Sequence, residues 1–578
     1  MDSSNKEIIL VGIPASPGIC HGEAMLFSQG QIDVPIYSIT EEDLESETKR
    51  LEEALLATRT EIIKIREQVS QSLGEGEALI FEAHLMVLED NALITEIIQY
   101  LNQNKKNIEH CFNEVVDRYI NFFKTVEDEY LRERVSDIRD VSRRVLNNLL
   151  GEKQGNTEVL DKKRIIVSED ISPSQAVGFD KNHLFGFITD SGGATSHFVI
   201  MSRSLKIPAV VGLHNATLQI KASDYLLIDG YEGKVYINPS VETLKSYEYK
   251  AHEKLAIEKT YEKELIEETV TLDDKRIELM VNIEGSKDLQ SSQQEYSDGI
   301  GLFRTESIYL KENGMPSEDL QYKEYASVVE LAKGKPVIIR TLDIGGDKLI
   351  HGVHDDSFLG LRAIRFCLEN LSVFRTQLRA ILRASVHGTV QVMYPMISGI
   401  EELNKANAIL DEVKQQLADE GIAFDPEIKV GAMIELPSAV TVIDLLADKV
   451  DFFSVGTNDL IQYLMAVDRM DDRVSHLYQP THPAVLRSLK SIFDQANQYN
   501  KPVCVCGEMA GDPIYTALLI GLGSNSLSVS PSRLAEVKHY IRLINLQSLK
   551  PLVGELLTMD QAEPIEAKLK DYIASLAK

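Results

Sequence analysis

From about Thr271 to the C-terminus, short apolar segments alternate with stretches of helical pattern. Eight of these segments have the composition of buried strands: IELMVNI, GIGLF, KPVIIRTLD, VQVMYPMI, IKVGAMIE, VDFFSVGTND, KPVCVCGE and SLSVSP. Eight strands that alternate with helices over about 300 residues predict a (β/α)₈ barrel. The segment FLGLRAIR is a ninth candidate strand, which leaves the register around the fourth strand open.

Charged and polar residues follow nearly every one of these strands. In a barrel of this kind the groups that do chemistry lie on one face, where the strands end and the loops begin. The residues at these positions are Arg304, Thr305 and Glu306 after the second strand, Arg340, Asp343 and Lys348 after the third, Glu435 after the fifth, Asn458, Asp459 and Arg469 after the sixth, and Cys506 and Glu508 after the seventh.

For any one of these residues, a structural salt bridge at a buried strand end is a sufficient explanation. Their occurrence together indicates more, because several Arg and Lys side chains with two carboxylates at one barrel mouth suit a polyanion and a divalent metal. Arginine binds phosphate and carboxylate oxygens through two parallel hydrogen bonds. Mg²⁺ is held by one or two carboxylates plus substrate oxygens and waters, which fits Glu435 and Asp459.

Cys506 is the further candidate for chemistry at this mouth. A thiol of ordinary pKa is mostly protonated at neutral pH and can donate a proton. The commoner role of a buried cysteine is that of a small apolar core residue. Cys504 lies two residues earlier on the same strand and would point to the same side, so alternation does not separate the two. Cys506 is preferred because it is nearest the strand end.

A glycine-rich segment before the barrel, FGFITDSGGATSHFVIMSRSLKIPAVVG, contains a second candidate site. A strand over Phe185 to Thr189 leads into Gly192 and Gly193, and a helix is expected to begin near His197. Free N–H groups at a helix start favour phosphate. Neutral imidazole can attack phosphorus, and the phosphoramidate formed can pass the group on. The alternative is a capping or core-edge histidine. The barrel mouth, which requires an anion, favours the nucleophile.

The chain before the barrel divides into three further parts. Residues 1–38 and 151–240 contain β-type segments and are expected to form one α/β domain. Residues 39–150 show helical periodicity and predict a helical bundle that interrupts that domain. Residues 241–270 form a long charged helical segment that is either a linker helix or an ordinary surface helix. Residues 271–578 hold the barrel. The expected fold class is therefore multidomain α/β.

Composition limits the class of partner. The formal net charge of −29 opposes binding to nucleic acid and to anionic lipid surfaces. No stretch approaches the roughly 20 apolar residues that cross a bilayer, and the N-terminus has no signal-peptide pattern. The five cysteines are scattered, which argues for a reducing cytoplasm and against a disulfide framework.

The motifs also resemble those of a known family. SGGATSH followed by SRSLKIPAVVG resembles the phosphohistidine loop shared by Enzyme I of the phosphotransferase system, phosphoenolpyruvate synthase and pyruvate phosphate dikinase. GLFRTE, RTLDIGGDK, LRAIR, FFSVGTNDLIQY, AVDR, HLYQP and CGEMAGD resemble the Enzyme I form of the phosphoenolpyruvate-binding barrel. IFEAHLMVLED and EDEYLRERVSDIRDV look like the bundle that docks the phosphocarrier protein HPr. The resemblance covers almost the entire chain.

This resemblance implies a role for each matching position. His197 would take a phosphoryl group from phosphoenolpyruvate and give it to a histidine of HPr, and Cys506 would protonate the pyruvate enolate. Glu435 and Asp459 would bind Mg²⁺. The substrate anion would be held by Arg304, Arg340, Arg362, Asn458 and Arg469. The resemblance also implies a histidine domain that swivels on the linker helix and a homodimer formed through the barrel.

Some positions depart from the family pattern. Ala194 stands where the family usually has Arg, and Phe198 stands where a small residue or Thr is common. The loss of that Arg removes one cation near the phosphohistidine, and these changes are expected to alter the transfer rate and the preferred acceptor. Phosphoenolpyruvate synthase and the dikinase would need an ATP-grasp domain, for which a helical bundle stands here. The remaining alternatives are a regulatory, nitrogen-type phosphorelay with the same chemistry, and a regulator that binds HPr without turnover.

Overall fold

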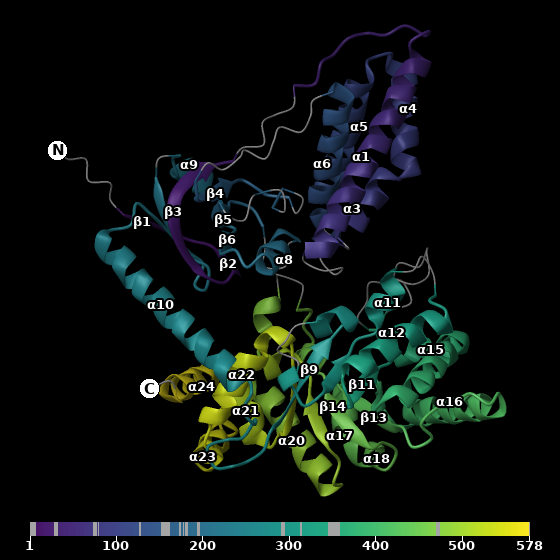
Figure 1. Cartoon of the computed structure of the whole chain (residues 1–578), viewed down its shortest axis with the longest axis vertical. Helices are drawn as coiled ribbons and strands as arrows, with labels where there is room; N and C mark the ends of the chain where they lie inside the picture. Colours follow the sequence, from purple (N-terminus) through teal and green to yellow (C-terminus); the bar gives the residue numbers. More distant parts are fainter. Residues whose placement is uncertain are drawn as a thin grey trace. The chain divides into compact units, whose positions relative to one another are not determined.

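The computed structural model divides the chain into two compact units, Met1–Leu255 and Ala256–Lys578 (Figure 1). Each unit has its own hydrophobic core. The residues that the structure describes are 7–27, 33–72, 78, 80–125, 129–151, 162–172, 175–176, 179, 183–192, 197–222, 224–290, 295–311, 315–344, 359–469 and 474–576.

The first unit contains an eight-stranded sheet with the order β1-β8-β7-β3-β4-β5-β6-β2. Strands β1 and β2 are consecutive in the chain, separated by Gly12 alone, yet they lie at opposite edges of the sheet. The sheet must therefore curl until its edges approach each other. A Cβ atom at Gly12 would come within 2.5 Å of the Val211 carbonyl oxygen, so the connection requires glycine. The strands are β1 Ile8–Val11, β2 Ile13–Ser16, β3 Ile19–Leu26, β4 Arg164–Ser168, β5 Leu184–Thr189, β6 Ala209–Val211, β7 Tyr225–Asp229 and β8 Lys234–Ile237.

A helical bundle lies in the chain between β3 and β4, which confirms the predicted interruption of the α/β sheet. Its long helices run side by side in Figure 1 around a core that includes Phe81, Ile97 and Val115. Asp90 caps one helix by accepting hydrogen bonds from the N–H groups of Ala92 (2.8 Å) and Leu93 (3.2 Å). The helices are α1 Leu44–Ser72, α3 Ile80–Leu88, α4 Asn91–Asn104, α5 Ile108–Thr125 and α6 Glu129–Leu150; two short helices, α8 His197–Ser204 and α9 Ala216–Gln219, belong to the sheet domain.

Helix α10, Val241–Glu264, contains the division between the two units. Near its start, the Thr243 hydroxyl donates to the Glu7 carboxylate at 2.7 Å. At its other end, the Glu264 carboxylate contacts His539 Nδ1 at 2.9 Å. The described side chains from 252 to 260 are exposed. The two ends of α10 are therefore anchored within their own units, which is the arrangement expected of a linker. The domain boundaries given above stay predictions.

The second unit is a closed barrel of eight parallel strands, which confirms the predicted barrel. All eight predicted segments contribute one strand each. The segment FLGLRAIR was wrong as a strand candidate, because Leu359–Ala363 is irregular and α14 begins at Ile364. The strands are β9 Glu278–Ile283, β10 Ile300–Phe303, β11 Val337–Arg340, β12 Val390–Tyr394, β13 Lys429–Ile434, β14 Phe452–Val455, β15 Val503–Val505 and β16 Ser526–Val529.

Helices surround the barrel, as Figure 1 shows. The core between strands and helices is built from large apolar side chains such as Phe366, Phe374 and Phe493. The helices are α11 Glu306–Lys311, α12 Glu318–Leu331, α14 Ile364–Glu369, α15 Leu371–Ala384, α16 Ile400–Asp419, α17 Pro437–Thr441, α18 Ile443–Ala447, α19 Thr457–Met465, α20 Pro483–Gln498, α21 Pro513–Leu522, α22 Leu534–Leu543, α23 Leu546–Leu556 and α24 Ala562–Leu576.

A buried lysine fixes the chain where it leaves α10. Lys538 Nζ on α22 donates hydrogen bonds to the carbonyl oxygens of Leu265 (2.7 Å), Glu267 (3.0 Å) and Tyr296 (3.1 Å). An ammonium group has three donors, so these three carbonyls satisfy it. Burial lowers the pKa of Lys538 to about 8, so the group is still protonated at neutral pH.

Lys538→Met is expected to lower the free energy of unfolding by roughly 2–4 kcal/mol, because three buried carbonyl oxygens lose a charged donor. Denaturant titration measures the difference. The matched control is Lys550→Met at an exposed position of α23, which should change the same quantity by less than about 0.5 kcal/mol. Equal stability of the two variants would contradict an anchoring role for Lys538.

Candidate functional site

The carboxyl ends of the barrel strands bring the predicted residues to one mouth. Because all eight strands are parallel and the sheet is closed, side chains that follow different strands must converge there. Arg340 is the last residue of β11, Glu435 follows β13 and Cys506 follows β15. Asp459 lies in the first turn of α19, just after β14.

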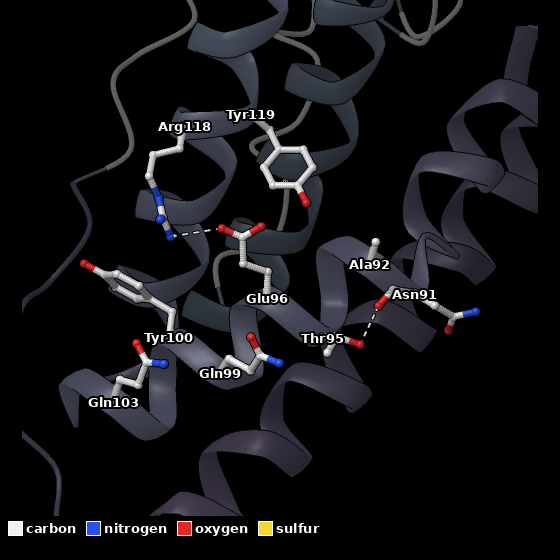
Figure 2. A pocket seen from close by; sticks show the side chains of 9 residues that line it. All are labelled: Asn91, Ala92, Thr95, Glu96, Gln99, Tyr100, Gln103, Arg118 and Tyr119. Atoms are coloured by element: carbon white, nitrogen blue, oxygen red, sulfur yellow. Dashed lines mark hydrogen bonds and ion pairs between the residues drawn. The ribbon is translucent and has the colours of Figure 1, made fainter. Parts of the chain in front are cut away.

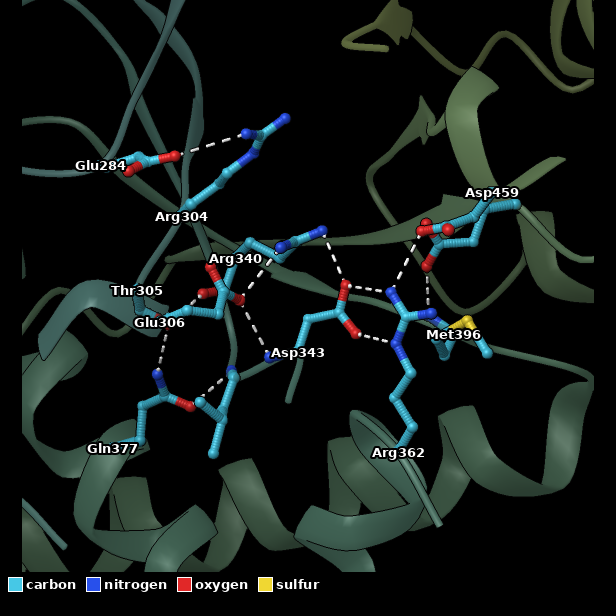
Figure 3. Close-up of polar contacts among 12 residues, drawn as sticks. Glu284, Arg304, Thr305, Glu306, Arg340, Asp343, Arg362, Gln377, Met396 and Asp459 are labelled. Atoms are coloured by element: carbon cyan, nitrogen blue, oxygen red, sulfur yellow. Dashed lines mark hydrogen bonds and ion pairs between the residues drawn. The ribbon is translucent and has the colours of Figure 1, made fainter. Parts of the chain in front are cut away.

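Two of the arginines form a continuous chain of ion pairs with three carboxylates, shown in Figure 3. Arg340 contacts Glu306 Oε1 at 3.0 Å and Asp343 Oδ2 at 2.9 Å. Arg362 contacts Asp343 Oδ1 at 2.8 Å and Oδ2 at 3.2 Å, and it reaches Asp459 Oδ2 at 3.2 Å. The order is therefore Glu306, Arg340, Asp343, Arg362, Asp459. We call these five residues the mouth network.

Burial makes the charges of the mouth network depend on each other. Burial alone would raise the pKa of Asp343, but Arg340 and Arg362 hold it below its ordinary value. Burial opposes the charged form of both guanidiniums as well, and the neighbouring carboxylates raise their pKa values above the ordinary one. All three groups are thus charged at neutral pH. An ordered set of buried cations is what a phosphate or carboxylate ligand requires.

A second layer of hydrogen bonds fixes the backbone around Arg340 (Figure 3). The Thr305 hydroxyl donates to the Arg340 carbonyl oxygen at 3.0 Å. The Gln377 amide donates to that hydroxyl at 3.0 Å and accepts from the Leu342 N–H at 2.9 Å. Thr305 and Gln377 have no exposed surface. The guanidinium of Arg340 is therefore carried on a backbone that has little freedom to shift.

Glu435 has the surroundings of a cation ligand. Its side chain is buried, and Oε1 accepts the N–H of Met396 at 2.6 Å. Met396 presents this N–H from a left-handed backbone conformation (φ 56°), a strained arrangement for a non-glycine residue. Burial, with Asp459 and Asp343 nearby, raises the pKa of Glu435. A divalent cation would relieve this crowding of carboxylates.

The residues present therefore fit a magnesium ion. A Cβ atom on Gly456 would come within 2.7 Å of Glu435 Oε2, so glycine leaves room beside that oxygen. Carboxylate oxygens are the ligands that Mg²⁺ prefers. Across the part of the chain that the structure describes, no group of three or more His, Cys, Asp or Glu side chains could hold a metal. A site here would rest on Glu435 and Asp459, with the remaining ligands from substrate and water.

Cys506 lies inside the barrel close to the mouth network. Its thiol is buried among apolar side chains that include Leu302, Ile338 and Met433. Burial raises the pKa of Cys506, while the charge of Arg340 acts in the opposite direction. Asn282 holds the backbone by donating to the Cys506 carbonyl oxygen at 3.0 Å. A protonated thiol at this position is suited to giving a proton to a ligand bound at the mouth.

Three predicted residues are less closely tied to the mouth network. The Arg304 side chain is 38% exposed and contacts Glu284 at 3.5 Å. Asn458 forms a reciprocal pair with Glu508, donating to Oε1 at 2.9 Å and accepting the Glu508 N–H at 2.9 Å. Arg469 is exposed and hydrogen-bonds Tyr478. The contacts thus join Arg340, Arg362 and Asp459 within the mouth network. Arg304, Asn458 and Arg469 lie outside that network.

Sequence reasoning assigned no role to several residues that the structure places in the site. Glu306 and Asp343 were named as strand-end residues. Glu306 orients Arg340 from 34 residues away in the chain, and Asp343 joins Arg340, which is local, to Arg362, which is 19 residues away. Tyr463, whose hydroxyl accepts from Arg362 Nη1 at 3.4 Å, was not singled out. Its place on the same helix as Asp459, four residues later, was the available signal.

The histidine segment of the first unit is described in part. β5 ends at Thr189, and Asp190 then accepts the N–H of Ala216, the first residue of α9, at 2.5 Å. His197 is the first residue of α8. Phe198 points into the core and packs edge-on against Phe187, with ring centroids 5.1 Å apart. The side chain of His197 and residues 193–196, with Ala194, lie outside the described residues.

An open hollow of about 710 Å³ lies on α4 and α5 of the bundle (Figure 2). Arg118 in this hollow contacts Glu96 at 3.4 Å and covers the ring of Tyr100 at 4.9 Å. The charges of Arg118 and Glu96 are therefore paired with each other. The lining residues are Asn91, Ala92, Thr95, Glu96, Gln99, Tyr100, Gln103, Arg118 and Tyr119. The barrel mouth, with its buried arginines, is the stronger candidate for an anion site.

Comparison with known proteins agrees with the geometry. Three family models match the chain: the N-terminal domain of phosphoenolpyruvate-utilising enzymes at residues 11–134, their mobile domain at 160–233 and their phosphoenolpyruvate-binding domain at 258–546. A curated relative from Priestia megaterium, named phosphoenolpyruvate-protein phosphotransferase, is 42% identical over 96% of this chain and 97% of its own length. The chain belongs to the phosphoenolpyruvate-protein phosphotransferase family.

A second curated relative supports this assignment. A relative of the same name from Enterococcus faecalis is 41% identical over 98% of this chain and 99% of its own length. A solved structure described as an NMR solution structure of Enzyme I is 39% identical, with a TM-score of 0.36, over 42% of this chain and 99% of that one. Family membership makes the chain a phosphoenolpyruvate-using phosphotransferase. None of its described helices is long and apolar enough to cross a membrane.

Asp343→Asn is expected to lower the free energy of unfolding by roughly 3–5 kcal/mol at neutral pH, because the guanidiniums of buried Arg340 and partly buried Arg362 lose their shared counter-charge. The folded-state pKa of Asp343 lies below its unfolded value, so its stabilisation is present above about pH 4 and is lost as the pH falls through the folded pKa. Denaturant titrations at several pH values measure the free energy of unfolding of both proteins. The difference between wild type and Asp343→Asn should become smaller in acid.

The matched control for this substitution is Asp319→Asn, which removes an exposed carboxylate that contacts Arg383 at 2.8 Å. The unfolding free energy of this variant should stay within about 0.5 kcal/mol of wild type. If the difference in unfolding free energy between wild type and Asp343→Asn is the same in acid as at neutral pH, the proposed charge pairing is contradicted.

Proposed function

We propose that this chain moves the phosphoryl group of phosphoenolpyruvate to its own His197 and then to a histidine of HPr, the first step of the sugar phosphotransferase system. The observation that carries the proposal is the mouth network, which holds Arg340 and Arg362 charged and oriented through the protein's own carboxylates. Family membership supports the donor. The names of the relatives from Priestia megaterium and Enterococcus faecalis support protein as the acceptor.

The arginines bind and orient the substrate anion. Arg340 and Arg362 are fixed by carboxylates, so little reorganisation is needed when phosphate and carboxylate oxygens arrive. Arg304, Asn458 and Arg469 complete the binding set from more exposed positions. Phosphoryl transfer depends mainly on positioning and on compensating charge, which a fixed set of guanidiniums provides.

Glu435 and Asp459 would hold Mg²⁺. A bound ion would supply positive charge that offsets the negative charge of the substrate. Asp459 Oδ2 also contacts Arg362 at 3.2 Å. A carboxylate has two oxygens, so Asp459 would serve the ion while it keeps Arg362 oriented toward the substrate.

Cys506 supplies the proton that completes the reaction. The P–O bond of phosphoenolpyruvate breaks, a P–N bond forms on His197, and the enolate of pyruvate remains. The Cys506 thiol gives its proton to the methylene carbon of that enolate, and pyruvate leaves. Cys506 is preferred to Cys504 because it directly follows β15, whereas Cys504 lies within the strand.

Other parts of the chain take supporting roles in this proposal. The bundle of residues 39–150 docks HPr, and α10 links the histidine domain to the barrel so that His197 can serve both partners. The barrel forms a homodimer. A regulatory, nitrogen-type relay would use the same chemistry with a different acceptor. The cytoplasmic location stays a prediction.

Incubation with isotope-labelled phosphoenolpyruvate and Mg²⁺ is expected to give an acid-labile, base-stable phosphoprotein that passes its label to HPr. His197→Ala should take up no label, because the nucleophile is gone. The control is His252→Ala on the exposed part of α10, which should label like wild type. Full labelling of His197→Ala would remove His197 from the mechanism. Label that moves to a regulatory acceptor and not to HPr would favour the nitrogen-type relay.

Glu435→Gln and Asp459→Asn are each expected to raise the Mg²⁺ concentration for half-maximal pyruvate formation by at least about tenfold. Each substitution removes a ligand charge while keeping the side-chain size. Rates of pyruvate formation over a range of Mg²⁺ concentrations measure the shift. Glu401→Gln, an exposed position on α16, is the control. Metal titrations that superimpose for all four proteins would refute the ligand assignment.

A further inference from the structure

The buried hydroxyl of Ser454 lies against the thiol of Cys506. Ser454 Oγ donates a hydrogen bond to Cys506 Sγ at 3.3 Å, and Cys506 Sγ lies 3.6 Å from the Val455 carbonyl oxygen. Ser454 has no exposed surface, and Cys506 is 2% exposed. The thiol is thus held between a hydroxyl donor and a carbonyl acceptor that come from neighbouring residues of β14.

The register of two barrel strands creates this contact. Val455 pairs with Val505 across β14 and β15, and the Cys506 N–H donates to the Val455 carbonyl oxygen at 3.1 Å. Extended strands point alternate side chains to the same face, so Ser454 lies on the inner face beside the residue that follows β15. The backbone pairing therefore places the two side chains within reach of each other.

Burial of a hydroxyl at this position costs folding free energy unless the hydroxyl forms a hydrogen bond. β14 is the buried sequence FFSV, where an apolar side chain would fill the space without a polar atom to satisfy. A neutral thiol is a weak acceptor, so the hydrogen bond from Ser454 to Cys506 adds little to the stability of the fold while the thiol is protonated. A thiolate is a charged acceptor and binds a hydroxyl about twice as strongly. The hydroxyl therefore favours the charged form of the sulfur.

We propose that Ser454 is a positioning residue that orients the Cys506 thiol and stabilises the thiolate left when its proton has been transferred. The inference rests on the proposed function, in which Cys506 protonates the enolate of pyruvate. In that step the S–H bond breaks, a C–H bond forms at the methylene carbon, and sulfur keeps the electron pair. The Ser454 O–H then donates to the thiolate until sulfur regains a proton from solvent water.

The other charged groups that act on this sulfur come from several strands. Arg340 and Arg304 favour the thiolate, whereas burial and the carboxylate of Glu435 oppose it. Cys504, on the same strand, adds a second thiol nearby. The remaining neighbours in the cluster are apolar. Ser454 is the residue among these that touches the sulfur with a neutral donor, so its removal leaves the charges around the thiol unchanged.

The direct test is the ionisation of Cys506 in Ser454→Ala, measured on metal-free protein in a chelator. The ultraviolet absorbance of the thiolate is recorded against pH, and the same variant carrying Cys506→Ala is subtracted so that the other cysteines and the tyrosines cancel. The midpoint is expected to rise by about one pH unit relative to wild type, or roughly tenfold less thiolate at a given pH. An unchanged midpoint overturns the proposal.

Two further variants separate the effect of losing the Ser454 hydroxyl from the effect of altered packing. Ser454→Thr keeps the hydroxyl and is expected to titrate like wild type; a midpoint shifted as far as in Ser454→Ala overturns the proposal even if the alanine variant folds poorly. Ser385→Ala removes another buried hydroxyl, which donates to the Leu382 carbonyl oxygen at 2.6 Å before β12 and so lies at the opposite end of the barrel. Its Cys506 midpoint should not move.

Kinetics give a readout that a merely structural role would not produce. Ser454→Ala should lower kcat for pyruvate formation about tenfold with little change in the KM for phosphoenolpyruvate, and its pH–rate profile should shift upward with the thiol midpoint. A raised KM with unchanged kcat overturns the proposal. Failure of wild type to form pyruvate would instead refute the proposed function, and the thiol titration would still test the contact between Ser454 and Cys506.

Discussion

The carboxylate of Asp343, held between the guanidiniums of Arg340 and Arg362, is the interaction on which the barrel mouth depends. Either arginine without it would be a buried charge with an incomplete set of partners, at a cost of several kcal/mol. With it, two cations are kept charged and in fixed positions before any ligand binds. A chain of net charge −29 can therefore still present a local cationic site to an anionic substrate.

The same network connects the anion site with the metal site. Asp459 contacts Arg362 and also lies close enough to Glu435 to raise its pKa. Glu435 in turn is fixed by Met396, which adopts a strained backbone conformation to present its N–H. Strain of this kind persists only where the surrounding structure enforces it. The barrel thus holds carboxylates close together, and a divalent cation would relieve their mutual repulsion.

The sequence was sufficient for the barrel and for the strand ends, because apolar strands and the residues that follow them are local patterns. It was insufficient for pairings between strands. Glu306 contacts Arg340, and Asp343 contacts Arg362, between separate strand ends. Ser454 meets Cys506 only because β14 and β15 pair in one register. FLGLRAIR has the composition of a strand, yet the chain turns there into α14. Phe198 could be named as a departure from the family, but its inward packing on Phe187 required the fold.

The central claim is that the arginines of the mouth network bind phosphoenolpyruvate. Calorimetric titration of phosphoenolpyruvate into the His197→Ala chain with Mg²⁺ measures this binding without turnover. The account predicts a defined affinity that falls at least about a hundredfold when Arg340 is also changed to Met, and that is unaltered by Lys333→Met at an exposed position. Equal affinity in the Arg340→Met and Lys333→Met backgrounds would contradict it.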